Sequence, residues 1–464
     1  MKIEFNNSRV ALILALPVFV YINIRAMMLA FTYDECWTYL GYATEDFWKV
    51  VTNEFPAANN HVLHSLVMGW FYDMFGQYEY ALRLPVLISF VVFTFFIYKI
   101  SKQLSAKMWW MPFILLVYQP YLLDYFVAAR GYALAMAFMF GSIYFIYLFA
   151  EKPNMRRVWS ALIFASLAAY SNFTYLLFFI AVVLCVLAIS VQKRKVARTT
   201  GVIGLVSIVL AVIVYKPITQ LIAAKELYYG GVSGFFNDTL STLARSFVYG
   251  TSEVNVLSWF FALVIALAGV LALAKFLSRT ALGVGFWLTF ILIAIETGSI
   301  LQHHLIGSPY LIDRTAIFFI PLILFALSWI VLQLKEGLIR NIVAFAFIFL
   351  SLINVLSSLN VSYLLDFKEY ADADKAIQMI YEDDSLPQDG FSIGKSIYMN
   401  APINFYRVKY GLERIEQSGL EYCEETQNTK YYYMFEKDIS CLEDKDVELM
   451  QYFPISRTYL YRAM

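Results

Sequence analysis

Long apolar runs, separated by short basic segments, dominate the first three quarters of the chain. A membrane-spanning helix needs about 20 mostly apolar residues. By that measure the pattern predicts eleven spans, near residues 10–31, 82–100, 108–126, 131–150, 157–172, 173–191, 199–217, 256–275, 281–300, 315–333 and 341–359. The first run is too long for a cleaved signal peptide, and no small-residue cleavage site follows it. The pattern therefore predicts an all-α polytopic membrane domain over residues 1–359.

Basic residues cluster in every second connection between the predicted spans. The clusters are Lys2 and Arg9; Lys99, Lys102 and Lys107; Lys152, Arg156 and Arg157; Lys193, Arg194, Lys195 and Arg198; Lys275 and Arg279; and Lys335 and Arg340. Short loops rich in lysine and arginine stay in the cytoplasm. All six clusters fall on one side if residues 32–81 stay outside. We therefore predict a multi-pass protein of the cell membrane with a cytoplasmic N-terminus and an extracytosolic segment 360–464.

Two external segments interrupt the spans, over residues 32–81 and 218–255. The first contains an amphipathic stretch, residues 61–75, which is rich in aromatic residues and short for a span. We interpret it as a helix lying at the outer surface of the bilayer. The alternative, a short span, would invert the later loops and place the basic clusters outside, against the charge rule.

The charged residues are distributed as if the two parts of the chain meet different environments. Only 15% of the residues are charged and 60% are hydrophobic, whereas soluble domains carry roughly 25% charged residues. Residues 360–464 hold 11 basic and 19 acidic side chains, a net charge of −8, and residues 1–359 carry the balancing +8. This composition excludes a soluble enzyme, a disordered protein and a disulfide-stapled secreted domain as descriptions of the whole chain.

Residues 360–464 read as a small α/β domain. The stretches 391–399 and 456–462 alternate like strands, and 403–412 is typical of a helix. Cys423 and Cys441 lie in this domain and could form a disulfide in an oxidising compartment. We expect Cys36 and Cys185 to be unpaired.

Ionisable residues gather at the predicted external ends of the spans. They are Asp34, Glu35, His61, His64, Arg83, Asp124, Arg130, His303, His304, Asp313 and Arg314, and they include all four histidines of the chain. Ionisable groups at membrane depth are expensive and usually mark a functional site. Each one alone is better explained as a solvated residue of a loop or of the interface. Together, on one side only, they favour an external polar site.

Asp34 and Glu35 come directly after the first predicted span. Adjacent helical residues do not share a face, so we expect one carboxylate to point into the site and the other to orient it. A carboxylate whose proton affinity is tuned by apolar surface and by neighbouring cations suits a general base. The alternative is an exposed acidic start of a loop, which the pair alone does not exclude.

The histidines and arginines suggest binding of an anion. His61 and His64 are three residues apart and share one helix face; that spacing suits a metal, which needs further ligands, but we favour hydrogen bonding to substrate or phosphate. Arg83, Arg130 and Arg314 each begin an apolar run, where a guanidinium can meet a phosphate bidentately or serve as an interfacial anchor. No P-loop or dinucleotide-type glycine motif occurs, and we expect no cofactor, with a divalent metal as the less favoured alternative.

These motifs occur in a recognisable order. The Asp-Glu pair is followed by NNHVLHSLVMGWFYDMFG (residues 59–76) and EYALRLP (79–85). This order resembles the polytopic GT-C-fold glycosyltransferases that use lipid-linked sugars, in particular the protein mannosyltransferase and lipid A aminoarabinose transferase group. The segment AARGYALAMAF (128–138) is similar to that group's A-R-x-Y-A-L element. The segment HHLIGSPYLIDRTAIFFIPL (303–322) resembles a later element more loosely.

The resemblance implies a function for the external site. It implies inverting transfer of a sugar from a polyprenyl-phosphate donor to an acceptor hydroxyl on a glycolipid, polysaccharide or protein, at the external face and without a nucleic-acid partner. Asp34 would be the general base, with Glu35 beside it. Arg130 and Arg314, with His303 or His304, would neutralise the departing polyprenyl phosphate, and His61, His64 and Arg83 would lie near the substrate.

Two departures from the group's pattern concern these roles. His61-Val62-Leu63 stands where relatives often have His-Pro-Pro, and Asp313-Arg314-Thr315 stands where many have an Arg-Tyr pair. The alternative function is a non-catalytic one: a flippase or transporter, or an inactive relative, that binds a lipid-linked anionic substrate.

Overall fold

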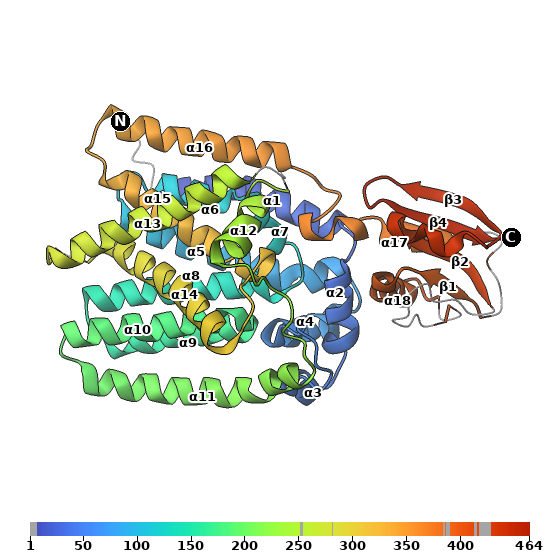
Figure 1. Cartoon of the computed structure of the whole chain (residues 1–464), viewed down its shortest axis with the longest axis horizontal. Coiled ribbons are helices and arrows are strands. Elements are labelled where there is room, and N and C mark those ends of the chain that lie inside the picture. The colour runs from blue at the N-terminus through green and yellow to red at the C-terminus, as the bar shows by residue number, and fades with distance from the viewer. Residues whose placement is uncertain are drawn as a thin grey trace.

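The computed structural model describes residues 7–250, 254–280, 282–383, 386, 390–412, 415–416 and 428–464. Eight of the described helices are long and apolar enough to cross a membrane. They are α1 (Asn7–Met28), α5 (Glu79–Leu104), α8 (Gly131–Glu151), α10 (Leu176–Gln192, preceded by the 3-10 turn η2, Phe173–Tyr175), α11 (Val196–Ala223), α13 (Asn255–Leu277), α14 (Val284–Ile306) and α16 (Leu338–Ser358). Figure 1 shows these helices running side by side as a bundle.

The other three predicted spans also fall on helices, but shorter ones, so the count of eleven spans is not confirmed. Two of them are α9 (Met155–Ser171) and α15 (Phe319–Gln333). The third, predicted over 108–126, is broken into α6 (Trp110–Val117) and α7 (Pro120–Tyr125). Pro120 has no N–H to continue the first helix, and the Gln119 side chain accepts hydrogen bonds from the N–H groups of Tyr121 and Leu122.

Helix α8 is the centre of the bundle. It packs against α5, α9, α10 and α14, and most of its residues are buried. Gly141 allows the close approach of α9, since a Cβ at this position would lie 2.3 Å from the ring of Phe164. By contrast, α16 lies at the edge of the bundle (Figure 1) and exposes most of its large apolar side chains, as a lipid-facing helix does.

The two ends of the bundle differ in character. The short helices α2 (Tyr33–Thr38), α3 (Phe47–Thr52) and α4 (Val62–Phe75) lie at the same end as the C-terminal domain (Figure 1). Helix α4 is the predicted surface helix. The connections that carry the basic clusters lie at the opposite end, where Lys107 pairs with Glu336 at 3.2 Å. We call these the site end and the basic end.

Four short elements complete the described part of the membrane domain. The π-helix η1 (Tyr39–Ala43) follows α2, and three others lie between α11 and α15 along the chain: the π-helix η3 (Phe235–Leu240), α12 (Ser241–Phe247) and the 3-10 turn η4 (Asp313–Ala316).

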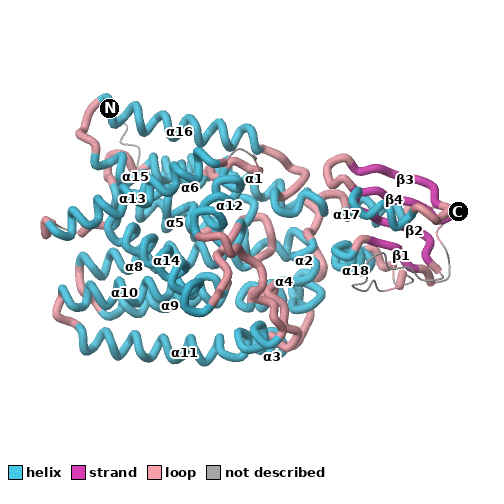
Figure 2. Tube along the Cα trace, in the orientation of Figure 1, coloured by secondary structure: helices cyan, strands magenta, loops and turns pink. Residues whose placement is uncertain are grey.

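The C-terminal domain begins with the 3-10 segment η5 (Leu365–Tyr370) and holds one four-stranded sheet (Figure 2). The other elements are α17 (Ala373–Tyr381), β1 (Ser392–Lys395), η6 (Ile397–Met399), α18 (Asn400–Lys409), β2 (Thr429–Phe435), η7 (Glu436–Leu442), β3 (Val447–Phe453) and β4 (Thr458–Ala463). The strand order is β1-β2-β4-β3, with β1 parallel to β2 and the other pairs antiparallel.

The predicted strands and helix of this domain correspond to β1, β4 and α18. The strand predicted over 391–399 is shorter than expected, because the chain turns into η6 after Lys395. Strands β2 and β3 were not predicted. Cys423 lies outside the described residues, so its expected disulfide with Cys441 is not described, and Cys36 and Cys185 are free and buried.

Candidate active site

The sequence of α2 positions the two adjacent carboxylates. Thr32 caps the helix: its side chain accepts a hydrogen bond from the N–H of Glu35, and the Glu35 carboxylate accepts one from the N–H of Thr32. This reciprocal arrangement is a capping box, which fixes the start of a helix. Because Asp34 precedes Glu35 by one residue, its side chain points in a different direction.

Both oxygens of the Glu35 carboxylate are hydrogen-bonded within the protein. Arg83 binds it bidentately, with Nε 2.9 Å from Oε1 and Nη2 2.9 Å from Oε2. The N–H of Ala129 donates to Oε1 at 2.7 Å, and the N–H of Thr32 donates to Oε2 at 3.0 Å. Each oxygen therefore accepts two hydrogen bonds, and both side chains are completely buried. Glu35 ties together α2, the start of α5 and the segment before α8.

Arg83 also closes the end of α1. Its Nη1 donates to the carbonyls of Ala26 and Leu29, and its Nη2 donates to the carbonyl of Ala30. These carbonyls lie at the end of α1, where a helix leaves acceptors without internal partners. With Glu35 and three carbonyls as partners, this guanidinium has no direction left for a substrate. The predicted placement of Arg83 near the substrate stays a prediction, and the contacts observed for Arg83 are structural ones.

Asp34 has the opposite environment. Its Oδ2 lies 3.6 Å from Nη2 of Arg130 and 3.7 Å from Nη2 of Arg314. Oδ2 is buried and has no hydrogen-bond partner among the described residues. The structure thus brings together one carboxylate oxygen and two guanidinium groups from segments about 100 and 280 residues further along the chain. This trio is the centre of the candidate site.

Arg130 is held firmly in place. Its Nη1 donates to Thr38 Oγ1 at 2.9 Å and to the carbonyls of Asn59 at 3.0 Å and Asp34 at 3.3 Å. Its Nη2 lies 2.9 Å from Nε2 of His61. Since a guanidinium can only donate, His61 accepts through Nε2 and carries its proton on Nδ1. Because Nε2 of His61 already accepts this hydrogen bond, it is not free to bind a metal.

Both histidines of this region are neutral. Burial, with the charge of Arg130 second, lowers the pKa of His61 well below its ordinary value, and the same two causes lower the pKa of His64 to about 3. Neither ring nitrogen of His64 has a hydrogen-bond partner among the described residues. No group of three or more His, Cys, Asp or Glu side chains in the described part of the chain is arranged to hold a metal ion.

Gly131 permits the approach that places Arg130 against His61. A Cβ at this position would lie 2.0 Å from the carbonyl oxygen of Ser171 and 2.7 Å from Cβ of His61. The atoms it would meet are backbone and the base of a side chain, which cannot move aside cheaply. The start of α8, the end of α9 and the start of α4 therefore meet at this glycine.

Arg314 is the accessible member of the trio. Its side chain is 24% exposed, compared with 3% for Arg130. The guanidinium lies over the ring of Tyr229 at 5.0 Å and over the ring of Phe367 at 5.5 Å. Asp313, in the left-handed region with φ of 44°, accepts a hydrogen bond from Tyr229, and burial raises its pKa. Arg314 therefore lies between Tyr229, which follows α11, and the start of the C-terminal domain.

His303 and His304 lie away from this centre. The ring of His303 stacks on Tyr310 at 4.3 Å, and its Nδ1 lies 2.9 Å from the carbonyl of Ser308. His304 is exposed. Neither side chain contacts Asp34, Arg130 or Arg314 in the described part of the chain. Their predicted role in binding the donor phosphate is therefore not supported by this geometry.

The C-terminal domain covers the helix that carries Asp34. The N–H of Phe31 donates to the hydroxyl of Tyr406 at 2.7 Å, and the two rings of Phe31 and Phe405 stack at 4.8 Å. Lys409 pairs with Glu79 at 3.0 Å. These contacts place the acidic domain directly on α2 and the start of α5.

Aromatic residues surround the position next to Asp34. Tyr33 stacks on Tyr370 at 5.9 Å and meets Tyr398 edge to face at 5.8 Å. Burial, with the Asp34 carboxylate second, raises the pKa of Tyr33 to about 12. Two of the three rings come from the C-terminal domain, so this domain forms part of the site.

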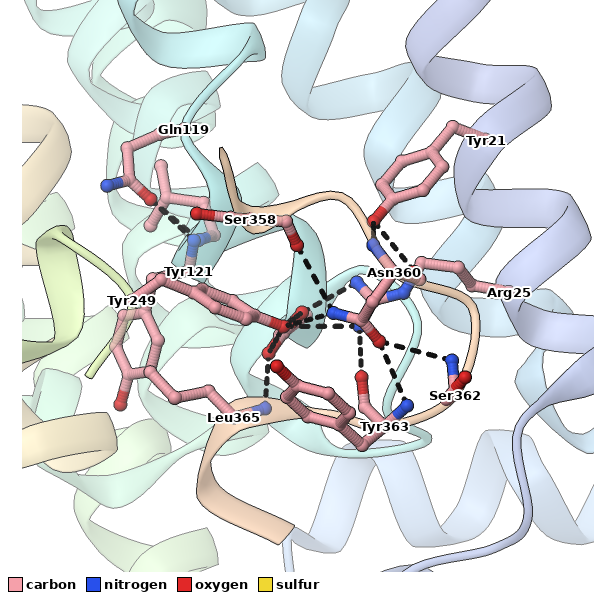
Figure 3. A network of polar contacts seen from close by, with 12 residues as sticks. Tyr21, Arg25, Gln119, Tyr121, Tyr249, Ser358, Asn360, Ser362, Tyr363 and Leu365 are labelled. Carbon is pink, nitrogen blue, oxygen red and sulfur yellow. Dashed lines mark hydrogen bonds and ion pairs between the residues drawn. The ribbon is translucent and has the colours of Figure 1, made fainter. Parts of the chain in front are cut away.

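A buried polar network joins the end of α1 to the start of the C-terminal domain (Figure 3). Arg25 and Asp124 form its centre, with Nη1 2.6 Å from Oδ1. Asp124 Oδ2 accepts from the N–H of Leu365 at 2.7 Å, Tyr249 donates to both Asp124 oxygens, and Arg25 Nη2 donates to the carbonyl of Tyr363 at 2.6 Å. Asp124 was among the predicted polar residues, whereas Arg25, a lone charge in the last turn of an apolar helix, was not.

A further link lies beside this network. Asp366 accepts hydrogen bonds from the hydroxyls of Tyr121 and Tyr125, one residue before the Phe367 ring that packs on Arg314. The sequence offered no signal for this link, because Asp366 lies about 240 positions after the two tyrosines.

An apolar groove of about 320 Å³ lies between α9 and α11. Its lining runs along α9 from Trp159 to Tyr170 and along α11 from Leu205 to Ile213, and it is almost wholly apolar. Tyr170 directly precedes Ser171, whose carbonyl meets the Gly131 position beside His61. The groove therefore ends close to the Arg130 side of the site.

Comparisons with known proteins concern the family and the fold of the chain. Residues 61–218, about a third of the chain, match the family model described as dolichyl-phosphate-mannose-protein mannosyltransferase. No curated protein matches the chain by sequence.

Solved structures extend the similarity to the whole chain. The structure of ArnT from Cupriavidus metallidurans in the apo state is similar with a TM-score of 0.56, at 12% identity and 98% coverage of both chains. The structure of the same protein bound to undecaprenyl phosphate gives a TM-score of 0.54, at 12% identity, with 99% of this chain and 98% of that one covered. The fold, the family match and the apolar helices together identify the chain as a multi-pass membrane protein of the GT-C type, similar to mannosyl- and aminoarabinose transferases.

Proposed function

We propose that this protein transfers a sugar from a polyprenyl-phosphate donor to an acceptor hydroxyl, with inversion, at the site end of the bundle. The observation that carries the proposal is the Asp34 carboxylate oxygen, which is buried, has no hydrogen-bond partner among the described residues, and faces two guanidinium groups. The ArnT structure that holds undecaprenyl phosphate supports a polyprenyl-phosphate partner.

The proposed reaction uses the three groups in separate roles. Asp34 accepts the proton of the acceptor hydroxyl as its oxygen forms a bond to the anomeric carbon of the sugar. The bond from that carbon to the phosphate oxygen breaks on the opposite face, and its electron pair leaves with the polyprenyl phosphate. Arg130 and Arg314 stabilise the negative charge on the leaving phosphate. Glu35, whose acceptor positions are all filled, is a positioning residue for Asp34.

The two arginines suit a phosphate for different reasons. Arg130 keeps a fixed geometry through four partners, so it offers a preorganised charge. Arg314 is partly exposed and is held mainly by two aromatic rings. At 3.6 and 3.7 Å from Asp34, neither guanidinium makes a hydrogen bond to that carboxylate. Each therefore retains donors for a phosphate oxygen.

The groove between α9 and α11 suits the isoprenoid chain of the donor. It is apolar along its length, and its side chains include Val209 at 48% exposed and Ile163 at 45% exposed, as expected for a surface in contact with lipid. Its end beside Tyr170 and Ser171 would bring a phosphate at the end of the chain toward Arg130. The basic clusters at the opposite end support a cytoplasmic orientation for that end and an external one for the site.

Transfer assays with Asp34→Asn test the proposal. Membranes or purified protein receive a radiolabelled polyprenyl-phosphate sugar, and transfer to endogenous or added acceptors is measured. We expect transfer to fall by about 10²–10⁴-fold, the usual contribution of a general base. The matched control is Asp46→Asn, an exposed acid on a neighbouring segment, which should transfer at the wild-type rate. Wild-type transfer by Asp34→Asn refutes the role of the carboxylate, and donor binding without any transfer favours a transporter or an inactive relative.

Donor-length and labelling experiments test the groove and the orientation. Val209→Trp, which fills the groove, should raise KM for a long-chain donor and leave KM for a short-chain donor unchanged. Ile208→Trp, at an exposed position beside the groove, should leave both unchanged. For orientation, a membrane-impermeant thiol reagent should label Asp444→Cys in intact cells, and Lys335→Cys only after permeabilisation; the reverse pattern overturns the external assignment.

A further inference from the structure

A second, larger cavity lies at the basic end of the bundle, away from the candidate active site. It has a volume of about 690 Å³, and its lining residues come from the ends of α8, α10 and α13 and the start of α14. One part of its lining is apolar and includes Phe276, Leu277 and Trp287. The other part is charged and consists of Glu151, Lys193 and Arg279. A cavity with an apolar wall and a charged wall, at the end of a membrane bundle, suits an amphiphile.

The charged residues of this cavity do not neutralise one another. In the part of the chain that the structure describes, Glu151, Lys193 and Arg279 take part in no ion pair, although they line the same space. The cavity therefore separates two positive groups from one negative group. A ligand that carries a negative and a positive group of its own would satisfy both sides.

The start of α14 adds to the positive side. Gly283 is its N-cap and supplies no side-chain hydrogen bond, and the first turn of this 23-residue helix contains no acidic residue. The free N–H groups at the start of a helix favour an anion. Leu282 and Trp287, which flank this start, both line the cavity. A phosphate here would meet Lys193, Arg279 and the helix terminus.

We propose that this cavity binds the headgroup of a glycerophospholipid with a phosphoethanolamine group, from the leaflet at the basic end. The phosphate lies toward Lys193, Arg279 and the start of α14, and the ammonium donates hydrogen bonds to Glu151. The acyl chains follow the apolar wall formed by Phe276 and Leu277. A purely anionic headgroup would leave the Glu151 carboxylate unpaired, and a choline headgroup has no N–H to donate to it. This site is independent of sugar transfer.

Native mass spectrometry of the purified full-length protein tests the site. The probes are phosphatidylethanolamine, phosphatidylglycerol and phosphatidylcholine with the same acyl chains, each in competition with soluble phosphoethanolamine. We expect wild type to bind phosphatidylethanolamine best. Lys193→Gln and Arg279→Gln should each weaken that binding about fivefold, the usual contribution of one basic residue near a membrane surface. Glu151→Gln should remove the preference for phosphatidylethanolamine over phosphatidylglycerol.

Lys335→Gln is the matched control, an exposed lysine at the same end that does not line the cavity; it should bind lipid as wild type does. All four positions are exposed, so equal melting temperatures in detergent should verify folding. A wild-type preference for phosphatidylglycerol, or equal binding by Glu151→Gln, overturns the zwitterion assignment. Displacement of the lipid by soluble phosphoethanolamine at equal concentration shows a soluble ligand rather than a lipid, and unchanged binding in both cation variants overturns the site.

Discussion

Exchanging each of the two adjacent carboxylates for its amide should have opposite consequences. Glu35→Gln should unfold the protein far more readily than Asp34→Asn, whereas Asp34→Asn should abolish transfer in a protein that remains folded. The contrast follows from hydrogen bonding alone, because the two residues share a helix turn, a charge and near-complete burial.

The loss of stability that we expect from Glu35→Gln follows from the four hydrogen bonds that Glu35 accepts. An amide has one acceptor oxygen, so its NH₂ group must face either Arg83 Nε and the N–H of Ala129, or Arg83 Nη2 and the N–H of Thr32. In both orientations two donors face a third donor, and Arg83 keeps a buried charge without a counter-ion. Removal of one partner from a buried pair costs about 3–5 kcal/mol.

The loss of stability that we expect from Asp34→Asn is smaller. Its ion-pair distances of 3.6 and 3.7 Å are longer than hydrogen bonds, and one of its partners is partly exposed. Arg130 retains four other hydrogen-bond partners when the charge is removed. Asp34→Asn therefore removes no hydrogen bond to the carboxylate, and we expect it to cost less than the loss of about 3–5 kcal/mol expected for Glu35→Gln.

Unfolding in mixed micelles of a mild detergent and sodium dodecyl sulfate, followed by tryptophan fluorescence, measures both variants on one scale. Radiolabel transfer on the same preparations measures activity. Equal destabilisation of the two variants would refute the division of labour between the carboxylates. So would a Glu35→Gln protein as stable as wild type, since it would show that Arg83 does not depend on its partner.

Three further predictions concern other parts of the site. Because the folded pKa of His64 is about 3 and the unfolded value is 6.5, the unfolded chain binds a proton at this residue as the pH falls below 6.5, and the folded protein does not. His64 should therefore lower stability by about 2 kcal/mol between pH 7.5 and 5, in addition to the loss from His61. His64→Phe should lose the contribution of His64 in thermal unfolding, and parallel curves for the two proteins contradict the reasoning. Gly131→Ala should destabilise the protein and reduce transfer, because the added Cβ would lie 2.0 Å from the Ser171 carbonyl oxygen. The control Gly201→Ala, which has open space around it, should instead raise the free energy of unfolding by up to about 1 kcal/mol. A Gly131→Ala protein as stable as wild type contradicts the close approach. Asp124→Asn should lower the free energy of unfolding by about 3–5 kcal/mol, because it leaves Arg25 without its counter-ion. Limited proteolysis of this variant should then cut near residue 363. The control Asp73→Asn, at an exposed acid, should leave the digestion pattern unchanged.

The apolar pattern predicted the helices well because it depends only on local composition. It placed helices at all eleven expected spans, but it did not detect the break before Pro120, where the Gln119 side chain ends one helix and begins another. It also missed β2 (TKYYYMF) and β3 (VELMQYF). Strand β2 is buried almost throughout, so it lacks the alternation that distinguishes a strand from a helix segment.

The candidate site was predictable as a set of residues but not as a geometry. Sidedness brought Asp34, Arg130 and Arg314 to one end, and the resemblance assigned their roles. The separation of Glu35 from Asp34 depends on Arg83 and on two backbone N–H groups, which sequence does not place in space. His303 and His304 lie at the same end of the bundle as the site, but His303 contacts Ser308 and Tyr310 instead. The distribution of charged loops predicts the end of the bundle at which a residue lies, but not its position around the bundle axis.

The contact between Phe31 and Tyr406 has a consequence for the biosynthesis of the protein. The two residues are separated by 375 positions, so a ribosome adding about 5–20 residues per second completes Tyr406 roughly 20–75 s after Phe31. During that interval α2 and Asp34 have left the ribosome without the domain that covers them. The site can therefore assemble only after the last spans have been inserted and the C-terminal domain has folded.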